Sequence, residues 1–150
     1  MSKQETEIKN GVIYEIRTLN NMMMRRAEAS ARIIGYEDCT LMHRLILTYL
    51  YHKKDEPVYQ KDLERVFSVN KSTMTAILKV MEKNQYICRV PEKRDARLKC
   101  LCLLPKAIAL KDKLADEVIG QTERQLTNGL TEEEIENFIA VVRKMKHNLE

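Results

Sequence analysis

The sequence predicts a mainly α-helical protein with one small β-hairpin (the α+β class), because two short helices are followed at once by two strands. Residues 62–69 carry apolar side chains at the spacing of an amphipathic helix. Residues 71–84 repeat that spacing after a short break at 68–70. The apolar face of this second helix carries Met74, Ile77, Leu78 and Met81. Its outer face carries small or polar side chains at Ser72, Thr73, Thr75, Ala76 and Lys79. Two helices joined in this way form a helix-turn-helix.

A charged hairpin comes directly after the helix pair. Residues 86–90 and 98–103 are rich in side chains that favour strands, and the turn at residues 91–97 reads PEKRDAR. A hairpin in this position is a wing. We therefore predict a winged helix-turn-helix over residues 57–104, a unit whose second helix suits insertion into the major groove of DNA.

Amphipathic helices are expected on both sides of this winged region. The first covers residues 8–34, with apolar side chains at spacings of three and four: Ile8, Val12, Ile16, Leu19 and Met23. The second opens with acidic and capping residues, Glu37, Asp38 and Thr40. Its apolar positions are Leu41, Leu45, Ile46, Tyr49 and Leu50. The predicted order leaves room for a short strand between this helix and residue 60.

Two further helices are expected after the hairpin. The first is long and begins near Pro105, with its apolar side at Ile108, Leu114, Val118, Thr122 and Leu126. Asn128 and Gly129 end it. Thr131 and Glu134 then form a capping box for the last helix. The apolar face of the last helix carries Ile135, Phe138, Ile139, Val142 and Met145.

Length and composition limit the class of protein. A chain of 150 residues is one domain, which buries roughly 70% of the surface that its unfolded form exposes. The apolar runs are far too short to span a bilayer, and no secretory signal opens the chain. We expect a single soluble domain over residues 1–150, located in the cytoplasm.

Positive charge is concentrated in the predicted helix-turn-helix and wing. The net charge of the whole chain is only +4. Residues 71–106 carry nine Lys or Arg against three Asp or Glu, so the rest of the chain is slightly acidic. This excess coincides with the second helix and the wing, which favours a nucleic-acid partner. The alternative is that these charges form only a solvated face.

The four cysteines, Cys39, Cys88, Cys100 and Cys102, do not have the spacing of a metal site. No Cys-x-x-Cys occurs, and the three histidines are scattered. A hairpin centred near Arg94 would place Cys88 opposite Cys100, which leaves an oxidant-sensing regulator as an alternative. The simpler interpretation is four reduced thiols that act as small apolar side chains. No metal and no cofactor are expected.

The sequence does not favour an enzyme. An active site needs a convergent acid, base or nucleophile, and no Ser/His/Asp, Cys/His or metal-ligand pattern stands out. With only four glycines, the chain has no glycine-rich loop for phosphate binding.

These motifs resemble the MarR (multiple antibiotic resistance regulator) family of winged-helix transcription factors. The likeness lies in the sequences KDLERVF and KSTMTAILKVMEKN, in the Asp95–Ala96–Arg97 of the wing, and in the closing GLTEEEIENFIAVVRKMKHNL. It extends from about residue 8 to the end of the chain. The chain departs from the family at Gln85, where a glycine is usual, and at residues 103–107, where Leu-Thr-x-x-Gly is usual.

The resemblance implies an intertwined homodimer in which the helices of residues 8–34 and 105–150 pair with those of a second copy. The apolar stripes of these helices agree with that, since a monomer of this size would struggle to bury them all. The alternative is that they pack within one subunit. A two-fold dimer would present two second helices to successive major grooves of a pseudo-palindromic site, and the regulator would most often be a repressor.

The candidate DNA-binding residues lie on the helix pair and the wing. They are Gln60, Lys61, Lys71, Ser72, Thr73, Thr75, Lys79, Lys93, Arg94, Asp95 and Arg97. Gln60 and Lys61 open a helix, where backbone N–H groups favour phosphate. Arg97 is the candidate for the minor groove, and Lys93 and Arg94 are candidates for phosphate contacts. Asp95 is expected to hold Arg97 and the turn rather than to touch DNA.

The family likeness also implies a small, often aromatic effector that weakens DNA binding. Residues that would line its pocket are Leu19, Met22, Met23, Met24, Tyr36 and His43, because Met side chains adapt to irregular ligands and His or Tyr supplies a polar handle. The alternative is that these residues are simply core. A second alternative for the whole chain is a winged helix that docks proteins without reading DNA, which would require an uncharged wing.

Overall fold

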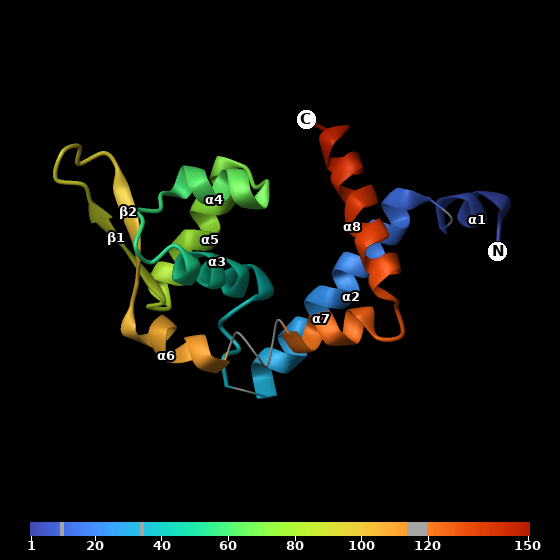
Figure 1. Ribbon diagram of the computed structural model, residues 1–150, viewed down its shortest axis with the longest axis horizontal. Helices are drawn as coiled ribbons and strands as arrows, with labels where there is room; N and C mark the ends of the chain where they lie inside the picture. The colour runs from blue at the N-terminus through green and yellow to red at the C-terminus, as the bar shows by residue number, and fades with distance from the viewer. Residues whose placement is uncertain (10, 34, 114–119) are drawn as a thin grey trace.

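The computed structural model describes residues 1–9, 11–33, 35–113 and 120–150. Figure 1 shows two parts joined near the bottom of the view, which we call the head and the arm. The head comprises residues 36–113, and the arm comprises residues 3–33 and 120–147 with the exception of residue 10. No helix in the described ranges is both long and apolar enough to span a membrane.

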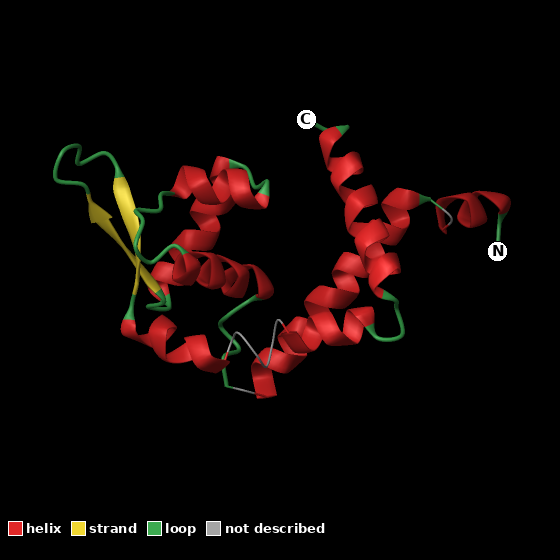
Figure 2. Cartoon of the chain, in the orientation of Figure 1, coloured by secondary structure: helices red, strands yellow, loops and turns green. Residues whose placement is uncertain are grey.

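The head is a winged helix-turn-helix, as predicted. Its elements are α3 (Leu41–His52), α4 (Gln60–Phe67), α5 (Lys71–Lys83), β1 (Ile87–Pro91), β2 (Lys99–Leu103) and α6 (Pro105–Lys113). Figure 2 shows the two strands as the only sheet among the described residues, at the far end of the head from the arm. The core lies between the helices and one face of the hairpin, and its fully buried side chains include Ile46, Leu47, Leu63, Met74, Leu78, Met81, Ile87 and Leu110.

The arm consists of helices that bury little surface in a single chain. They are α1 (Lys3–Lys9), α2 (Val12–Ile33), α7 (Gly120–Thr127) and α8 (Glu132–His147). Among the described residues of α2, only Ala27 and Ala31 are buried, and α7 and α8 bury none. In the view of Figure 1 the helix α8 crosses α2, and α1 extends beyond them.

One expected helix differs from the structure. It is interrupted near Gly11, which separates α1 from α2 and has a low intrinsic helix propensity. Of the long helix expected after Pro105, the structure describes α6 and α7, and the predicted positions Leu114 and Val118 lie outside the described residues. The helix α6 packs in the head, where Ala107 and Leu110 are fully buried.

The short strand allowed for before residue 60 is not formed in the described part of the chain. A single backbone hydrogen bond stands in its place, with the N–H of Leu101 donating to the carbonyl of Val58 at 2.8 Å. One bond attaches this segment to β2 but does not make a ladder of strand pairs.

The register of the hairpin corrects the expected cysteine pairing. Cys88 lies opposite Cys102, and Cys100 lies opposite Val90, so the expected Cys88–Cys100 pair was wrong. The hairpin is centred on Asp95 rather than Arg94. The Oδ1 atom of Asp95 accepts a hydrogen bond from the backbone N–H of Arg97 at 3.0 Å, a local turn that determines where the strands begin to pair.

The predicted helix caps are present at both expected places. The Oγ1 of Thr131 accepts a hydrogen bond from the N–H of Glu134, and the carboxylate of Glu134 accepts one from the N–H of Thr131. Thr40 caps α3 in the same way, with His43 as its partner. The Nδ1 atom of His43 accepts a hydrogen bond from the N–H of Thr40 at 3.2 Å, which indicates a neutral imidazole protonated on its other nitrogen.

This cap makes stability dependent on pH. Burial lowers the pKa of His43 below its ordinary 6.5, so the unfolded chain binds a proton more readily than the folded one. The free energy of unfolding should therefore fall as the pH drops below about 6.5 towards the lowered pKa. We expect His43→Gln, which keeps an acceptor for the cap, to lose less stability than the wild type between pH 7.5 and 5.5 in urea unfolding. The exposed substitution His147→Gln is the control, and an unchanged pH dependence in His43→Gln would refute the assignment.

Candidate nucleic-acid interface

Helix α5 presents its first turns to solvent. The side chain of Asn70 caps it, because Asn70 Oδ1 accepts a hydrogen bond from the N–H of Thr73 at 2.9 Å. The hydroxyl of Ser72 donates to the same oxygen at 2.9 Å. Met74, Leu78 and Met81 hold the opposite face of the helix in the core, so the exposed face carries Lys71, Ser72, Thr73, Ala76 and Lys79.

Gln60 connects α4, α5 and β1. Its amide nitrogen donates to Thr75 Oγ1 at 2.8 Å and to Glu64 Oε1 at 3.0 Å. Its amide oxygen accepts a hydrogen bond from Arg89 at 3.2 Å. Gln60 and the half-buried Thr75, both predicted to lie at the DNA surface, are thus engaged with other side chains and position the helices relative to the strand.

Arg89 is a residue of this surface that the sequence reasoning missed. Its Nε atom lies 2.6 Å from Glu82 Oε1, an ion pair that ties β1 to α5. Arg89 stands opposite Leu101, on the face of the hairpin that packs against the head. The sequence does contain a signal that could have identified Arg89. It lies at a core-facing position of an alternating strand, and an arginine in such a position requires an acidic partner.

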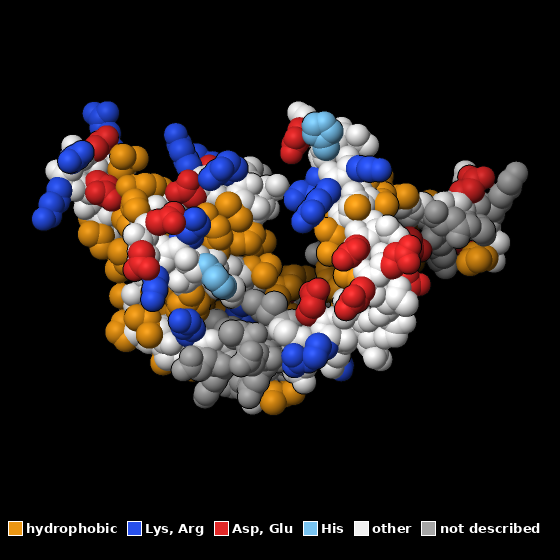
Figure 3. All heavy atoms as spheres, viewed as in Figure 1, with side chains coloured by type: hydrophobic (Ala, Val, Ile, Leu, Met, Phe, Trp, Pro, Cys, Tyr) orange, Lys and Arg blue, Asp and Glu red, His pale blue; other side chains and the backbone are white. Residues whose placement is uncertain are grey.

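The wing is held at its base and free at its tip. The hydroxyl of Tyr59 donates to Glu92 Oε1 at 2.9 Å, which ties the segment before α4 to the start of the wing. The N–H of Glu92 donates to the carbonyl of Leu98 at 2.8 Å, and Asp95 closes the turn. Lys93, Arg94 and Arg97 are exposed, and Figure 3 shows basic side chains gathered at this end of the molecule.

A groove of about 360 Å³ separates the wing from α4 and the start of α5. It is lined by Tyr59, Gln60, Lys61, Glu64, Lys71, Thr75, Arg89, Arg97, Leu98 and Lys99. Five of the predicted residues therefore come together here from three separate elements: Gln60, Lys61, Lys71, Thr75 and Arg97. The lining carries five cations and one carboxylate, so the groove is electropositive. An exposed helix face beside a basic groove is a surface that can hold the backbone of a nucleic acid.

The residues predicted to line a ligand pocket belong to both parts of the molecule. Leu19 and Met23 are half-buried on α2 in the arm. Tyr36 packs against the core of the head, and the Nδ1 of His43 is occupied by the helix cap. The fully buried Arg44 donates to the carbonyl of Ala27 at 2.9 Å, and its Nη1 atom has no hydrogen-bond partner among the described residues.

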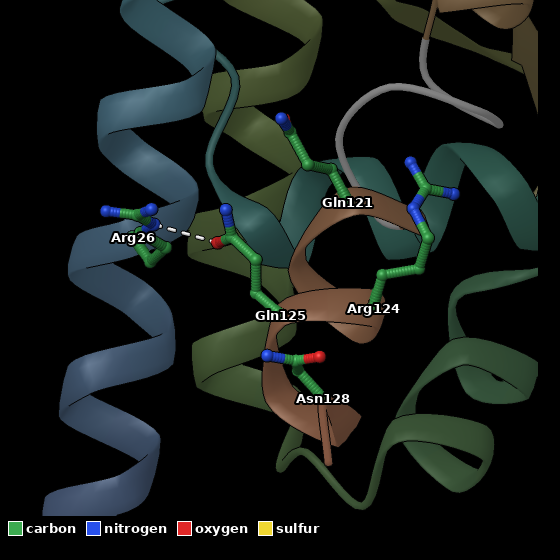
Figure 4. Close-up of a pocket in the computed structure, with 5 residues that line it drawn as sticks. All are labelled: Arg26, Gln121, Arg124, Gln125 and Asn128. Carbon is green, nitrogen blue, oxygen red and sulfur yellow. Dashed lines mark hydrogen bonds between the residues drawn. The ribbon is translucent and has the colours of Figure 1, made fainter.

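A second hollow, of about 460 Å³, lies on the arm (Figure 4). Figure 4 shows Arg26 of α2 reaching Gln125 of α7, with a hydrogen bond of 2.8 Å between Arg26 Nε and Gln125 Oε1. Its other lining residues are Gln121, Arg124 and Asn128. All five side chains are polar, so this hollow lacks the apolar walls that an aromatic effector requires.

Comparison with known proteins shows a likeness to one family. A sequence profile of the MarR family matches residues 38–98, the stretch that forms α3, the helix-turn-helix and the wing. Over this stretch the chain is similar to the MarR family. Members of this family are transcriptional regulators rather than enzymes, which agrees with the absence of a catalytic pattern in the sequence.

Similar proteins match this chain over most of its length. The HTH-type transcriptional regulator YybA of Bacillus subtilis, itself uncharacterised, is 27% identical over 129 residues, which is 85% of each chain. The crystal structure of the transcription regulator MarR from Oenococcus oeni has a TM-score of 0.75 and 28% identity, covering 91% of this chain and 99% of its own. The structure of S. aureus MepR bound to DNA has a TM-score of 0.80 at 24% identity, covering 93% and 97%.

Proposed function

We propose that this protein is a MarR-family regulator that binds a pseudo-palindromic DNA site as a homodimer and acts there as a repressor. The observation that carries the proposal is the electropositive groove between α5 and the wing, which gathers basic side chains from α4, α5 and the hairpin. A docking module would need a wing without charge, and this wing exposes Lys93, Arg94 and Arg97. The DNA complex of MepR supports the proposal, because MepR has the same fold.

Helix α5 would enter the major groove with its exposed first turns. Ser72 and Thr73 are short, so the helix can approach the base edges closely. Lys79 lies two turns further along the same exposed face and can reach a phosphate or the acceptor atoms of a guanine. Lys61 and Lys71, on the rim of the basic groove, would bind the backbone that flanks this site.

The wing would bind the adjacent minor groove. Arg97 is both exposed at the wing and part of the basic groove, which suits a guanidinium drawn to the negative potential of a narrow minor groove. Lys93 and Arg94 would contact phosphates without sequence preference. Asp95 is held by its bond to the N–H of Arg97, so its role is to shape the turn that presents Arg97.

The arm would form the dimer. Its helices α2 and α8 leave large apolar side chains exposed, among them Val12, Ile13, Ile16, Phe138 and Ile139. Figure 3 shows hydrophobic side chains at the surface of the arm beside α8. Pairing of two arms about a two-fold axis would bury these faces and direct the two α5 helices towards successive major grooves. The dimerisation surface would then comprise α1, α2, α7 and α8, while α6 remains with the head.

An aromatic acid is the effector class that we infer. Its carboxylate would bind the unpartnered Nη1 of the buried Arg44, and its ring would lie among Leu19, Met23 and Tyr36 between the arm and the head. A thermal shift screen with aromatic acids, followed by DNA titration, tests this inference. It is wrong if no compound changes both the melting temperature and the affinity for DNA.

The proposed function as a whole is tested by electrophoretic mobility of fragmented genomic DNA. The wild-type protein should retard a subset of fragments at low salt, and the retardation should weaken steeply as salt rises, because bound Lys and Arg displace counterions from the phosphates. Fragments that migrate unchanged at every protein concentration would exclude DNA binding and favour the docking module.

A further inference from the structure

Three of the four cysteines lie on one face of the wing hairpin. Cys88 is directly opposite Cys102 in the antiparallel pair, and Cys100 is two residues from Cys102 on the same strand. Side chains alternate between the faces of a strand, so these three thiols share a face, while Ile87 and Leu101 point into the core. Residues directly opposite have Cβ atoms about 4.5–5.5 Å apart, so the two thiols can reach one common atom.

The thiols are free and accessible to small molecules. Cys88, Cys100 and Cys102 are each half-buried and form no disulfide, whereas Cys39 is enclosed in the core. Cys88 also lines a hollow of about 580 Å³ between β1 and α5, which gives a ligand access to it. The Cys102 thiol donates to the backbone carbonyl of Cys100, with Sγ 4.0 Å from that oxygen. Both Cys88 and Cys100 raise the pKa of Cys102, as expected of neighbouring thiols.

The chemistry of this cluster does not favour a peroxide sensor. Burial raises the pKa of the Cys102 thiol, and the adjacent Cys100 and Cys88 raise it further. Peroxide-sensing cysteines react as thiolates and have lowered pKa values. A protonated thiol can still react with a compound of arsenic, an element that prefers sulfur ligands. The arsenic atom displaces the thiol proton, because thiolate sulfur is a soft ligand. No set of three or more His, Cys, Asp or Glu side chains in the described ranges is gathered for a metal ion, which favours a ligand that needs only two thiols.

We propose that Cys88 and Cys102 form a chelating dithiol site for trivalent organic arsenicals. The arsenic of a compound R–As=O exchanges its oxygen for two sulfur atoms. Two As–S bonds form, the As–O bonds are lost, and the two thiol protons leave with that oxygen as one water molecule. Arsenic remains trivalent, so no oxidant or reductant is required. The adduct would cross-link β1 to β2 at the base of the wing, and this inference does not depend on the proposed function.

The experiment uses phenylarsine oxide with the full chain. We expect intact-mass spectrometry to show one phenylarsenic group per chain, removed by a dithiol such as dithiothreitol but not by an equal concentration of a monothiol. Cys88→Ser and Cys102→Ser should each weaken binding by at least about a hundredfold, because each removes one thiol of the only directly opposed pair among the three. The remaining Cys100 is two residues, or about 6.6 Å, from Cys102 along the strand. Cys100→Ser is the matched control on the same face, and it should bind as the wild type does.

A second measurement avoids dependence on the folding of the variants. In the wild-type protein, phenylarsine oxide should protect Cys88 and Cys102 from iodoacetamide while Cys100 remains open to alkylation, as mapped by peptide mass spectrometry. Protection of Cys100 in place of Cys88, full binding by Cys88→Ser, or no adduct in the wild type would each overturn the proposal.

Discussion

Replacing Arg97 and Lys93 together by alanine is expected to weaken DNA binding by about a hundredfold or more. Arg97 is the cation that the wing presents at the basic groove, and Lys93 is exposed in the same turn. A lost arginine contact to DNA costs about 1–3 kcal/mol, and a dimer loses both cations twice. Because both side chains are exposed, the fold should be unaffected. Titration of fluorescent DNA at several salt concentrations measures the change, and the slope of log affinity against log salt should become shallower.

The control for this variant removes the same charge elsewhere. Arg32 and Lys54 are exposed and lie outside the helix-turn-helix and the wing, so Arg32→Ala plus Lys54→Ala should bind DNA nearly as well as the wild type. If the two double variants bound DNA equally, the wing would have no special role. Equally diminished binding would leave net charge as the only source of affinity.

Introducing aspartate at Ile16 and Phe138 is expected to convert the proposed dimer to a monomer. In the single chain these side chains are 53% and 57% exposed, so a charge there should leave the fold intact. In a dimer that covers them, each carboxylate would be buried without a partner, at a cost of several kcal/mol per ion. The dimer would carry four such carboxylates, and even about 4 kcal/mol in all corresponds to a thousandfold weaker association. Light scattering coupled to size exclusion reports the mass directly.

The same variant should also lose most of its affinity for DNA. A monomer presents one α5 helix, so binding no longer benefits from the second half-site held at the right spacing. Asn137→Asp is the matched control, since it adds a charge at an exposed polar position of α8. A Phe138 and Ile16 double variant that remained dimeric would show that the apolar arm faces are not the interface.

Periodicity predicted helices α3, α4 and α5 of the head. The apolar spacing in residues 71–84 identified Met74, Leu78 and Met81 as the buried face of α5, and all three are fully enclosed. Burial of such a stripe stabilises a short helix more than intrinsic propensity does, so the pattern is a dependable guide. The caps at Thr40 and Thr131 were predictable for a similar reason, because they depend on neighbours only three residues away.

The register of the hairpin was harder to predict because it depends on one turn. Shifting the centre from Arg94 to Asp95 changes the partner of Cys88 from Cys100 to Cys102. Either choice leaves the same side chains on the same face, so the hydrophobic pattern cannot distinguish them. The bond between Asp95 and the N–H of Arg97 is the local contact associated with the observed turn.

The contacts among side chains of the candidate site were not predictable from spacing. Gln60 was expected at the DNA surface because it opens a helix, yet its amide joins Thr75 on α5 and Arg89 on β1. Those partners are 15 and 29 residues away, so no periodic pattern links them. The exposed positions of the basic residues were easier to predict. An exposed charge needs no partner, so its place on the helix or wing is enough to predict that it faces solvent.

Selection of bound fragments from a random DNA library tests the central claim most directly. The account predicts an enriched motif with two inverted half-sites whose centres lie about one helical turn, or roughly 10 base pairs, apart, because two α5 helices related by a two-fold axis enter successive major grooves. A single asymmetric half-site, or no enrichment over the starting library, would contradict it.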